Sequence, residues 1–160
     1  MSGNQKLKSK KLRPTRIREL KKIIRNSFFV LLTSLPLLLT YCGNNTAERI
    51  KNQLRQEIQA IKSQCPQDQG NGLTITDANF HENEKIMEYV YSIVGLDSID
   101  DATVEDMKNS MITAFRSEIS GTERLSIKLI LKNGYRYRYI YNDTAGNKLC
   151  EINITEDDLS

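Results

Sequence analysis

The sequence predicts an α+β fold with the element order α-β-β-α-α-β-β, in which a four-stranded antiparallel sheet carries its helices packed on one face. Apolar residues recur at helical spacing in two long segments, and they alternate with polar residues in two pairs of short segments joined by turn sequences. Each pair reads as a hairpin, so the two hairpins are expected to share one sheet that packs against the helices. These elements lie within residues 47–160, which are expected to form a single domain.

The first predicted helix covers residues 47–64. Its apolar side chains recur at spacings of four, four and three residues, which places them on one helix face. These residues are Ile50, Leu54, Ile58 and Ile61. The helix is expected to end before Cys65-Pro66, because the residue before a proline avoids the helical conformation. The polar segment 66–72 is expected to form a loop.

Four segments alternate between apolar and polar residues, as half-buried strands do. They are residues 73–80, 85–94, 135–142 and 148–155. The polar sequence HENE joins the first two segments, and a turn through residues 143–147 joins the last two. Cys150 shares its strand face with Ile152 and Ile154, which turns it toward the core.

Residues 103–119 form the second predicted helix, which Asp101 or Thr103 is expected to cap. Residues 121–132 fit both a helix and an alternating strand. The helix is favoured because Ser120-Gly-Thr-Glu123 has the spacing of a capping box, and Asn133-Gly134 is typical of a helix end.

The strand over residues 135–142 has a tyrosine at its first position and at every second position after it. The tyrosines are Tyr135, Tyr137, Tyr139 and Tyr141. A row of this kind could stack on sugar rings or hold a peptide, but packing into the core is favoured because a half-buried strand needs one large apolar face. The opposite face carries Arg136 and Arg138, a candidate binding surface for an acidic partner.

The first 41 residues read as a signal peptide. Residues 1–26 carry ten Lys and Arg against Glu19 alone, and residues 27–41 contain no charged side chain. This basic region followed by a short apolar region is the signal-peptide pattern, because a membrane-spanning helix needs about 20 apolar residues. An uncleaved anchor over residues 27–41 stays open as the alternative, and a nucleic-acid-binding arm is a weaker one.

The end of this segment resembles the lipobox of bacterial lipoproteins. The matching residues are Leu39, Thr40, Cys42 and Gly43. The resemblance implies that the Cys42 thiol takes a diacylglyceryl group and that cleavage leaves Cys42 as the mature N-terminus. Tyr41 departs from the family pattern, in which a small residue precedes the cysteine. Residues 42–46 would then be a lipid-anchored tether, holding the domain at a membrane through its acyl chains.

Without its first 41 residues the chain has 119 residues, with thirteen Lys and Arg against nineteen Asp and Glu, a formal charge of −6. This acidic balance argues against nucleic-acid binding. Two cysteines remain besides Cys42. Outside the cytoplasm, Cys65 and Cys150 are expected to form a disulfide rather than to act as reactive thiols.

No catalytic, nucleotide-binding or metal-ligand motif occurs in the chain, so no cofactor and no metal are expected. His81 stands beside Glu82, Glu84 and Glu88, but their spacing matches no usual metal site and favours a solvated turn.

The domain also resembles a group of small, uncharacterised Bacteroidetes envelope lipoproteins. The resemblance covers about residues 45–159. It depends on Cys65-Pro66, the glycine-containing loop after it, and the strand sequences Glu88-Tyr-Val-Tyr91 and Tyr135-Arg-Tyr-Arg-Tyr139. It implies a location in the cell envelope and no known activity.

The sequence therefore predicts a lipid-anchored protein of a Gram-negative cell envelope, periplasmic or surface-facing. Its domain is expected to be a non-enzymatic module that binds an unknown protein or polymer. Two alternatives stay open. One is an inhibitor or immunity protein that uses the face of Arg136 and Arg138, and the other is an envelope hydrolase that works through carboxylates.

Overall fold

The computed structural model describes residues 46–117 and 121–160. The predicted signal peptide over residues 1–41, the lipidation site Cys42 and the tether up to residue 45 lie outside the described residues. Among the helices that are described, none combines the length and the apolar character needed to cross a membrane.

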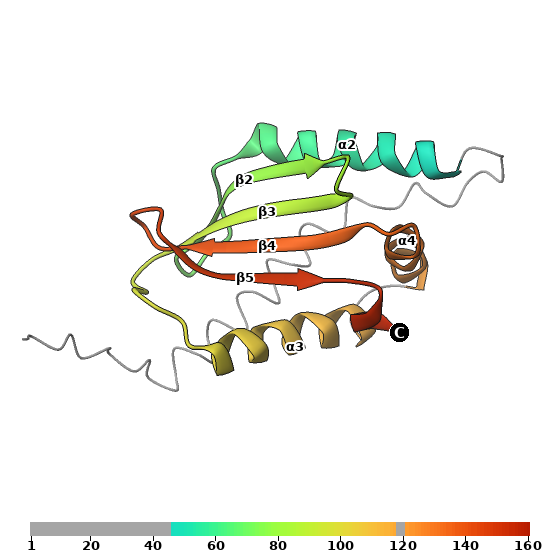
Figure 1. The fold of residues 1–160 in the computed structure, drawn as a ribbon. Coiled ribbons are helices and arrows are strands. Elements are labelled where there is room, and N and C mark those ends of the chain that lie inside the picture. The colour runs from blue at the N-terminus through green and yellow to red at the C-terminus, as the bar shows by residue number, and fades with distance from the viewer. Residues whose placement is uncertain (1–45, 118–120) are drawn as a thin grey trace, which may run out of the picture.

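The described chain folds into α-helices packed against one sheet (Figure 1). The order is α2 Thr46–Gln64, β1 Gln67–Asp68, β2 Leu73–His81, β3 Ile86–Ile93, α3 Asp101–Ser117, α4 Gly121–Lys132, β4 Arg136–Asn142, β5 Lys148–Ile154 and the short 3-10 helix η1 Asp157–Leu159. The α+β class is confirmed, and each predicted helix and strand is present, although residues 118 and 119 of the predicted helix 103–119 lie outside the described residues. Residues 121–132 are helical, and Gly134 follows α4 with a φ of 82°, a conformation that favours glycine at a helix end.

The sheet differs from the prediction in two ways. It has five strands in the order β1-β2-β3-β4-β5, because the two-residue strand β1 pairs with β2 where a loop was expected. It is also mixed rather than antiparallel, because β3 and β4 run parallel. The two hairpins β2-β3 and β4-β5 are antiparallel, as predicted.

The connection between β3 and β4 explains the parallel pair. In Figure 1, α3 carries the chain back along the sheet beside β5, and α4 lies at the end of the sheet where β4 begins. The chain therefore enters β4 at the same end at which it entered β3. A parallel pair needs such a crossover of a dozen or more residues.

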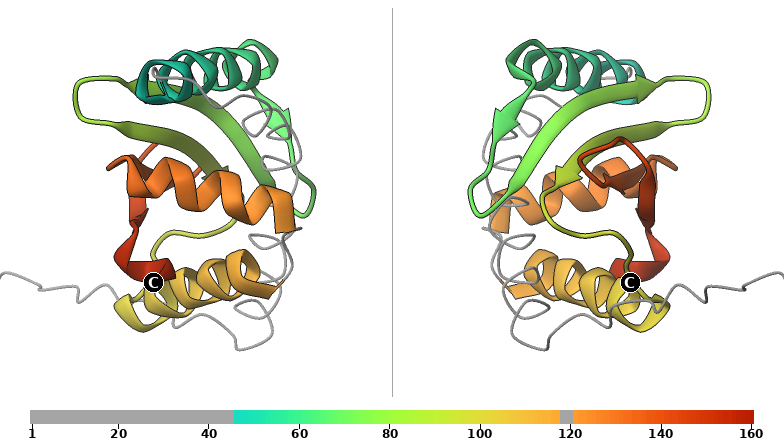
Figure 2. Two further views of the ribbon diagram at one scale, coloured as in Figure 1. Left: turned by 90° about the vertical axis from the view of Figure 1, so that its right-hand side faces the viewer. Right: turned by 90° about the vertical axis from the view of Figure 1, so that its left-hand side faces the viewer.

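The helices cover one face of the sheet and build a single core with it. Figure 2 shows α3 and α4 on the same side of the strands. The core combines side chains of α2, α3 and α4 with the tyrosine row of β4, and Tyr89 and Tyr91 stack on Tyr139 and Tyr141 with ring centroids 5.5 and 5.2 Å apart. Burial raises the pKa of Tyr89, Tyr139 and Tyr141 well above its usual value. The prediction that the tyrosines pack into the core is confirmed.

The N-terminal cap of α3 corrects a second prediction. The carboxylate Oδ1 of Asp100 accepts a hydrogen bond of 2.8 Å from the backbone N–H of Thr103, and its carbonyl accepts one from Val104. Asp100 therefore caps the helix, whereas Asp101 is its first residue.

The predicted disulfide is wrong in this structure, in which Cys65 and Cys150 are both free thiols. Cys65 precedes β1 at one edge of the sheet, and Cys150 lies on β5 at the other edge. Neighbouring strands are about 4.8 Å apart, so β1 and β5 are much too far apart for the 4.4–6.8 Å that the Cα atoms of a disulfide require. Cys150 does face the core, as predicted.

Candidate functional site

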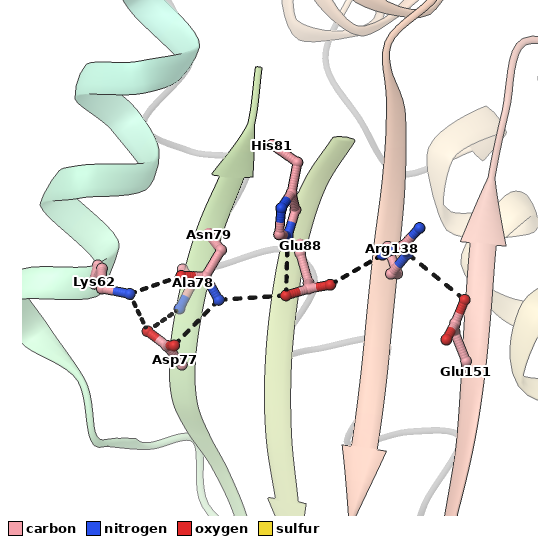
Figure 3. Close-up of polar contacts among 8 residues, drawn as sticks. All are labelled: Lys62, Asp77, Ala78, Asn79, His81, Glu88, Arg138 and Glu151. Carbon is pink, nitrogen blue, oxygen red and sulfur yellow. Dashed lines mark hydrogen bonds and ion pairs between the residues drawn. The ribbon is translucent and has the colours of Figure 1, made fainter. Parts of the chain in front are cut away.

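A row of polar side chains crosses the sheet on the face opposite the core (Figure 3). We call it the polar row. Its members are Lys62, Asp77, Asn79, His81, Glu88, Arg138 and Glu151. They come from α2 and from β2, β3, β4 and β5, and the strand register places them side by side because Asn79 pairs with Glu88 and Glu88 pairs with Arg138.

The half of the row near α2 centres on Asn79. Nζ of Lys62 lies 2.9 Å from Oδ1 of Asp77 and donates to Oδ1 of Asn79 at 2.7 Å. The amide of Asn79 donates to Asp77 at 3.1 Å and to Glu88 at 3.3 Å. Burial would raise the pKa of Asp77, but the hydrogen bonds from Lys62, Asn79 and the backbone of Ala78 hold it below its usual value.

Glu88 is the centre of the row and is only 9% exposed. Its Oε2 accepts a hydrogen bond of 3.2 Å from Arg138, and Nε2 of His81 lies 3.2 Å from its Oε1. Burial alone would raise the pKa of Glu88, but His81, Arg138 and Asn79 together lower it. Glu88 is thus held as a carboxylate that already has its partners.

The half of the row near β5 continues the alternation of charge. Nε of Arg138 lies 3.6 Å from Oε1 of Glu151, and Lys148 lies 3.1 Å from the other oxygen of that carboxylate. Hydrogen bonds from Asn153 and Lys148 lower the pKa of Glu151. Each charge of the row therefore faces an opposite charge, which is typical of a structural network.

This arrangement divides the predicted binding surface. Arg136 is exposed, whereas Arg138 lies between Glu88 and Glu151 with its side chain 23% exposed. An acidic partner would have to compete with two carboxylates for Arg138. The predicted binding surface thus offers one accessible guanidinium, that of Arg136, rather than two.

The acidic turn beside His81 is also occupied by ion pairs. Glu82 pairs with both Lys51 and Arg55 of α2, and hydrogen bonds from Arg55 and Lys51 lower its pKa. In the part of the chain that the structure describes, no three His, Cys, Asp or Glu side chains form a group that could hold a metal ion.

A second candidate is a cavity of about 180 Å³ between α3, α4 and η1. We call it the basic cavity. Its lining residues are Phe115, Arg116, Arg124, Ile127, Lys128 and Leu159. Three of the six are cationic, three are apolar and none is acidic. Figure 2 shows the C-terminal end of the chain beside α3.

Polar contacts of two α3 side chains keep η1 beside the cavity. Arg116 donates through one terminal nitrogen to the carbonyl oxygens of Asp158 and Ser160 at 3.0 and 3.3 Å. Lys108 lies 2.8 Å from the carboxylate of Asp158, which also accepts a hydrogen bond from the backbone of Thr155. The carboxylate of Asp158, next to the lining residue Leu159, is therefore already paired.

The titratable groups show what chemistry this domain can support. Every carboxyl group with a clear pKa shift in the described residues is shifted downward; these are Asp77, Glu82, Glu88, Asp143, Glu151 and Asp158. A carboxylate-dependent hydrolase needs one carboxyl with a raised pKa as its general acid. Burial raises the pKa of the thiol of Cys65 and brings that of Cys150 to about 11, so neither thiol is a ready nucleophile at neutral pH.

Neither site was predicted as a whole from the sequence, although Arg138 was singled out. The polar row had one usable signal, since each strand places a charged or amide residue on the face opposite its apolar residues. The basic cavity had none, because α3, α4 and η1 are brought together only by the tertiary fold.

The comparisons with known proteins concern the fold and the family. The structure is similar to the pilotin EpsS of the Vibrio vulnificus type 2 secretion system, with a TM-score of 0.51 and 10% sequence identity over 71% of this chain and 94% of that one. The type 2 secretion pilotin AspS of Vibrio cholerae has a TM-score of 0.47 and 14% identity over 69% and 93% of the two chains. At such low identity, the likeness to EpsS shows a shared fold and nothing more.

The sequence comparisons give the family. No curated protein matches this sequence. The model of one family, described as a domain of unknown function (DUF8479), matches residues 46–150, which is more than half of the chain and nearly all of the folded domain. The chain therefore belongs to the DUF8479 family.

Proposed function

We propose that this protein is a lipid-anchored component of a Gram-negative cell envelope and that its domain binds another envelope protein without catalysing a reaction. The observation that carries the proposal is the fold shared with a pilotin of a type 2 secretion system, which extends over 94% of that protein. That protein is a pilotin of a secretion system, and its fold offers this chain a scaffold for a comparable binding role.

The leader supports the membrane part of the proposal. Cys42 stands at the end of an uncharged apolar segment, and Thr46, the first residue of α2, follows four positions later. Four residues span at most about 14 Å when fully extended. An acylated Cys42 would therefore keep the domain close to the surface of the membrane, where a partner embedded in or bound to that membrane is within reach.

The state of the titratable groups supports a binding role over a catalytic one. The carboxylates of the polar row are paired and their pKa values are lowered, and the two thiols have raised pKa values. The paired carboxylates are suited to holding the strands together. The basic cavity, by contrast, presents cations and apolar side chains that are suited to contact with another molecule.

The experiment that tests the anchor compares two cysteine variants of the full chain. Cells that express the wild-type protein, Cys42→Ala or the matched control Cys65→Ala are fed a clickable fatty-acid analogue. Their membranes are then washed with high salt. We expect label and membrane retention for the wild-type protein and for Cys65→Ala, and the loss of both for Cys42→Ala. The intact mass of the extracted wild-type protein should equal residues 42–160 plus acyl chains.

Two outcomes would contradict the lipid anchor. If unlabelled Cys42→Ala stays in the washed membranes at its full-chain mass, residues 27–41 act as a membrane anchor. If the wild-type protein takes up no label and is released by salt, it is not a lipoprotein.

A further inference from the structure

We infer that the basic cavity is a docking site for an acidic peptide segment of the protein partner, in which one apolar side chain enters the cavity and neighbouring carboxylates meet its three cations. This inference rests on the proposed function, because it names the part of the domain that would contact the partner. It concerns a surface formed by α3, α4 and η1, on the side of the sheet away from the polar row.

The size of the cavity decides what kind of group can enter. Sites for cofactors and drug-sized ligands usually have volumes of about 300–1,000 Å³. The basic cavity, at about 180 Å³, is smaller. An apolar cavity of roughly 150 Å³ takes up one benzene molecule. The basic cavity therefore accommodates a single aromatic or branched aliphatic side chain, the kind of anchor that dominates protein interfaces.

The charges of the lining decide what flanks that side chain. Arg116, Arg124 and Lys128 line the cavity without an acidic residue among them, although the chain from residue 42 onward carries a formal charge of −6. The side chain of Lys128 is exposed and forms no hydrogen bond or ion pair with any described residue. Arg side chains bind carboxylates with two parallel hydrogen bonds in a fixed geometry. The lining thus complements a peptide that carries Asp or Glu beside its apolar residue.

Two further features favour a protein partner. Arg116 is already oriented by its bonds to the carbonyl oxygens of Asp158 and Ser160, so less side-chain freedom is lost when it binds a carboxylate. Leu125, one turn before Lys128 on α4, is 58% exposed and is one of two large hydrophobic side chains that stand out among the described residues. It provides a second apolar contact beside the cavity for an extended segment.

The test uses the full-length protein in neutral phosphatidylcholine nanodiscs and three fluorescein-labelled peptides, EDFDE, EDADE and KKFKK. Fluorescence anisotropy is measured during titration with wild-type protein, Lys128→Glu, Lys128→Arg and the control Arg136→Glu. The control makes the same change of charge on the opposite face of the sheet. Circular dichroism and thermal melting establish that each variant is folded. Empty nanodiscs measure binding to the lipid alone.

We expect the wild-type protein to bind EDFDE about tenfold more tightly than EDADE and not to bind KKFKK. Lys128→Glu should weaken the binding of EDFDE by about tenfold or more, whereas Lys128→Arg and Arg136→Glu should change it by less than about twofold.

Several results would overturn the inference. One is a flat titration of EDFDE up to about 1 mM protein. Another is an equal loss of affinity in Lys128→Glu and Arg136→Glu, which would mean attraction to the overall charge. If Lys128→Glu leaves peptide binding intact but reduces flotation with phosphatidylglycerol vesicles, the cavity meets anionic lipid instead. None of these results depends on acylation of Cys42, so this inference and the proposed anchor can fail separately.

Discussion

Arg138 and Glu88 join the two strands of the sheet that no hairpin connects. They occupy paired positions on the parallel strands β4 and β3, and Nη1 of Arg138 donates to Oε2 of Glu88 at 3.2 Å across 50 positions of sequence. On the other face of the same two strands, Tyr89 stacks on Tyr139. The β3–β4 seam is therefore held by an ion pair on one face and by stacked rings on the other.

Removal of the charge of Glu88 should weaken this seam. In Glu88→Gln, Arg138 and His81 lose a carboxylate in a nearly buried position, and hydrogen bonds to charged groups contribute about 1.5–3 kcal/mol. We expect the free energy of unfolding to fall by about 1–3 kcal/mol, measured by urea denaturation of the full-length protein at pH 7.

The matched control is Arg136→Gln, which removes an exposed charge two residues from Arg138. It should change the free energy of unfolding by less than about 0.5 kcal/mol. A double-mutant cycle with Glu88→Gln and Arg138→Gln should give a clear coupling energy. If the changes in the free energy of unfolding caused by the two single substitutions simply add in the double variant, the ion pair does not stabilise the seam.

Stability should fall in acid because of the same carboxylates. The pKa values of Glu88 and Asp77 lie below their usual values of 4.5 and 3.8 in the folded protein. As the pH falls, these carboxylates therefore take up protons in the unfolded chain before they do so in the folded protein. The stabilising contribution of each carboxylate to the free energy of unfolding is thus present above its unfolded pKa and is lost as the pH falls through its folded pKa. Urea denaturation between pH 7 and pH 3 should show a decline that begins near pH 5.

Glu88→Gln should make this decline shallower, because one of the titrating groups is gone. The variant Glu84→Gln is the control, since Glu84 is an exposed acid of the neighbouring turn. A decline in Glu88→Gln that is as steep as in the wild-type protein would show that Glu88 does not contribute to it.

The sequence predicts individual elements well because their signals are local. The alternation in residues 85–94 and 135–142 identifies which tyrosines share a face, and the tyrosines do face the core. The capping-box spacing before residues 121–132 and the Asn-Gly sequence after them correctly favoured a helix over a strand. In each case, the information lies within the segment or next to it.

The arrangement of the elements was harder to predict because it depends on long-range contacts. No pattern within residues 85–94 indicates that β4 lies beside β3 or that the two strands run in the same direction. That choice follows from how α3 and α4 pack, which also creates the basic cavity. The polar row was missed for the same reason, since Asn79, Glu88 and Arg138 become neighbours only in the finished sheet. The prediction of a disulfide failed because it used compartment and count rather than geometry.

Alkylation tests the state of the two domain cysteines. With the protein unfolded in denaturant and without reductant, mass spectrometry should find an alkylated thiol on both Cys65 and Cys150. In the folded protein Cys65 should react much faster, because it is partly exposed, whereas Cys150 is buried with a pKa of about 11. A peptide in which the two cysteines are linked would contradict the structure.

The structure assigns the cap of α3 to Asp100, whereas the sequence predicted Asp101 or Thr103. Asp100 accepts a hydrogen bond of 2.8 Å from the backbone N–H of Thr103, whereas Asp101 is exposed in the first turn.

Loss of an N-cap side chain costs about 0.5–2 kcal/mol, while an acidic residue in the first turn contributes about 0.3–1 kcal/mol through the helix dipole. Asp100→Ala removes the cap bond and should therefore lower the free energy of unfolding by about 1 kcal/mol. Asp101→Ala, which removes the same charge one position later, should cost only a few tenths of a kcal/mol in the same urea titration. If Asp101→Ala costs as much as Asp100→Ala, the charge near the helix end matters and the cap bond does not. The cap bond holds only the first turn of α3. Its loss should therefore speed hydrogen exchange in that turn before it affects β4.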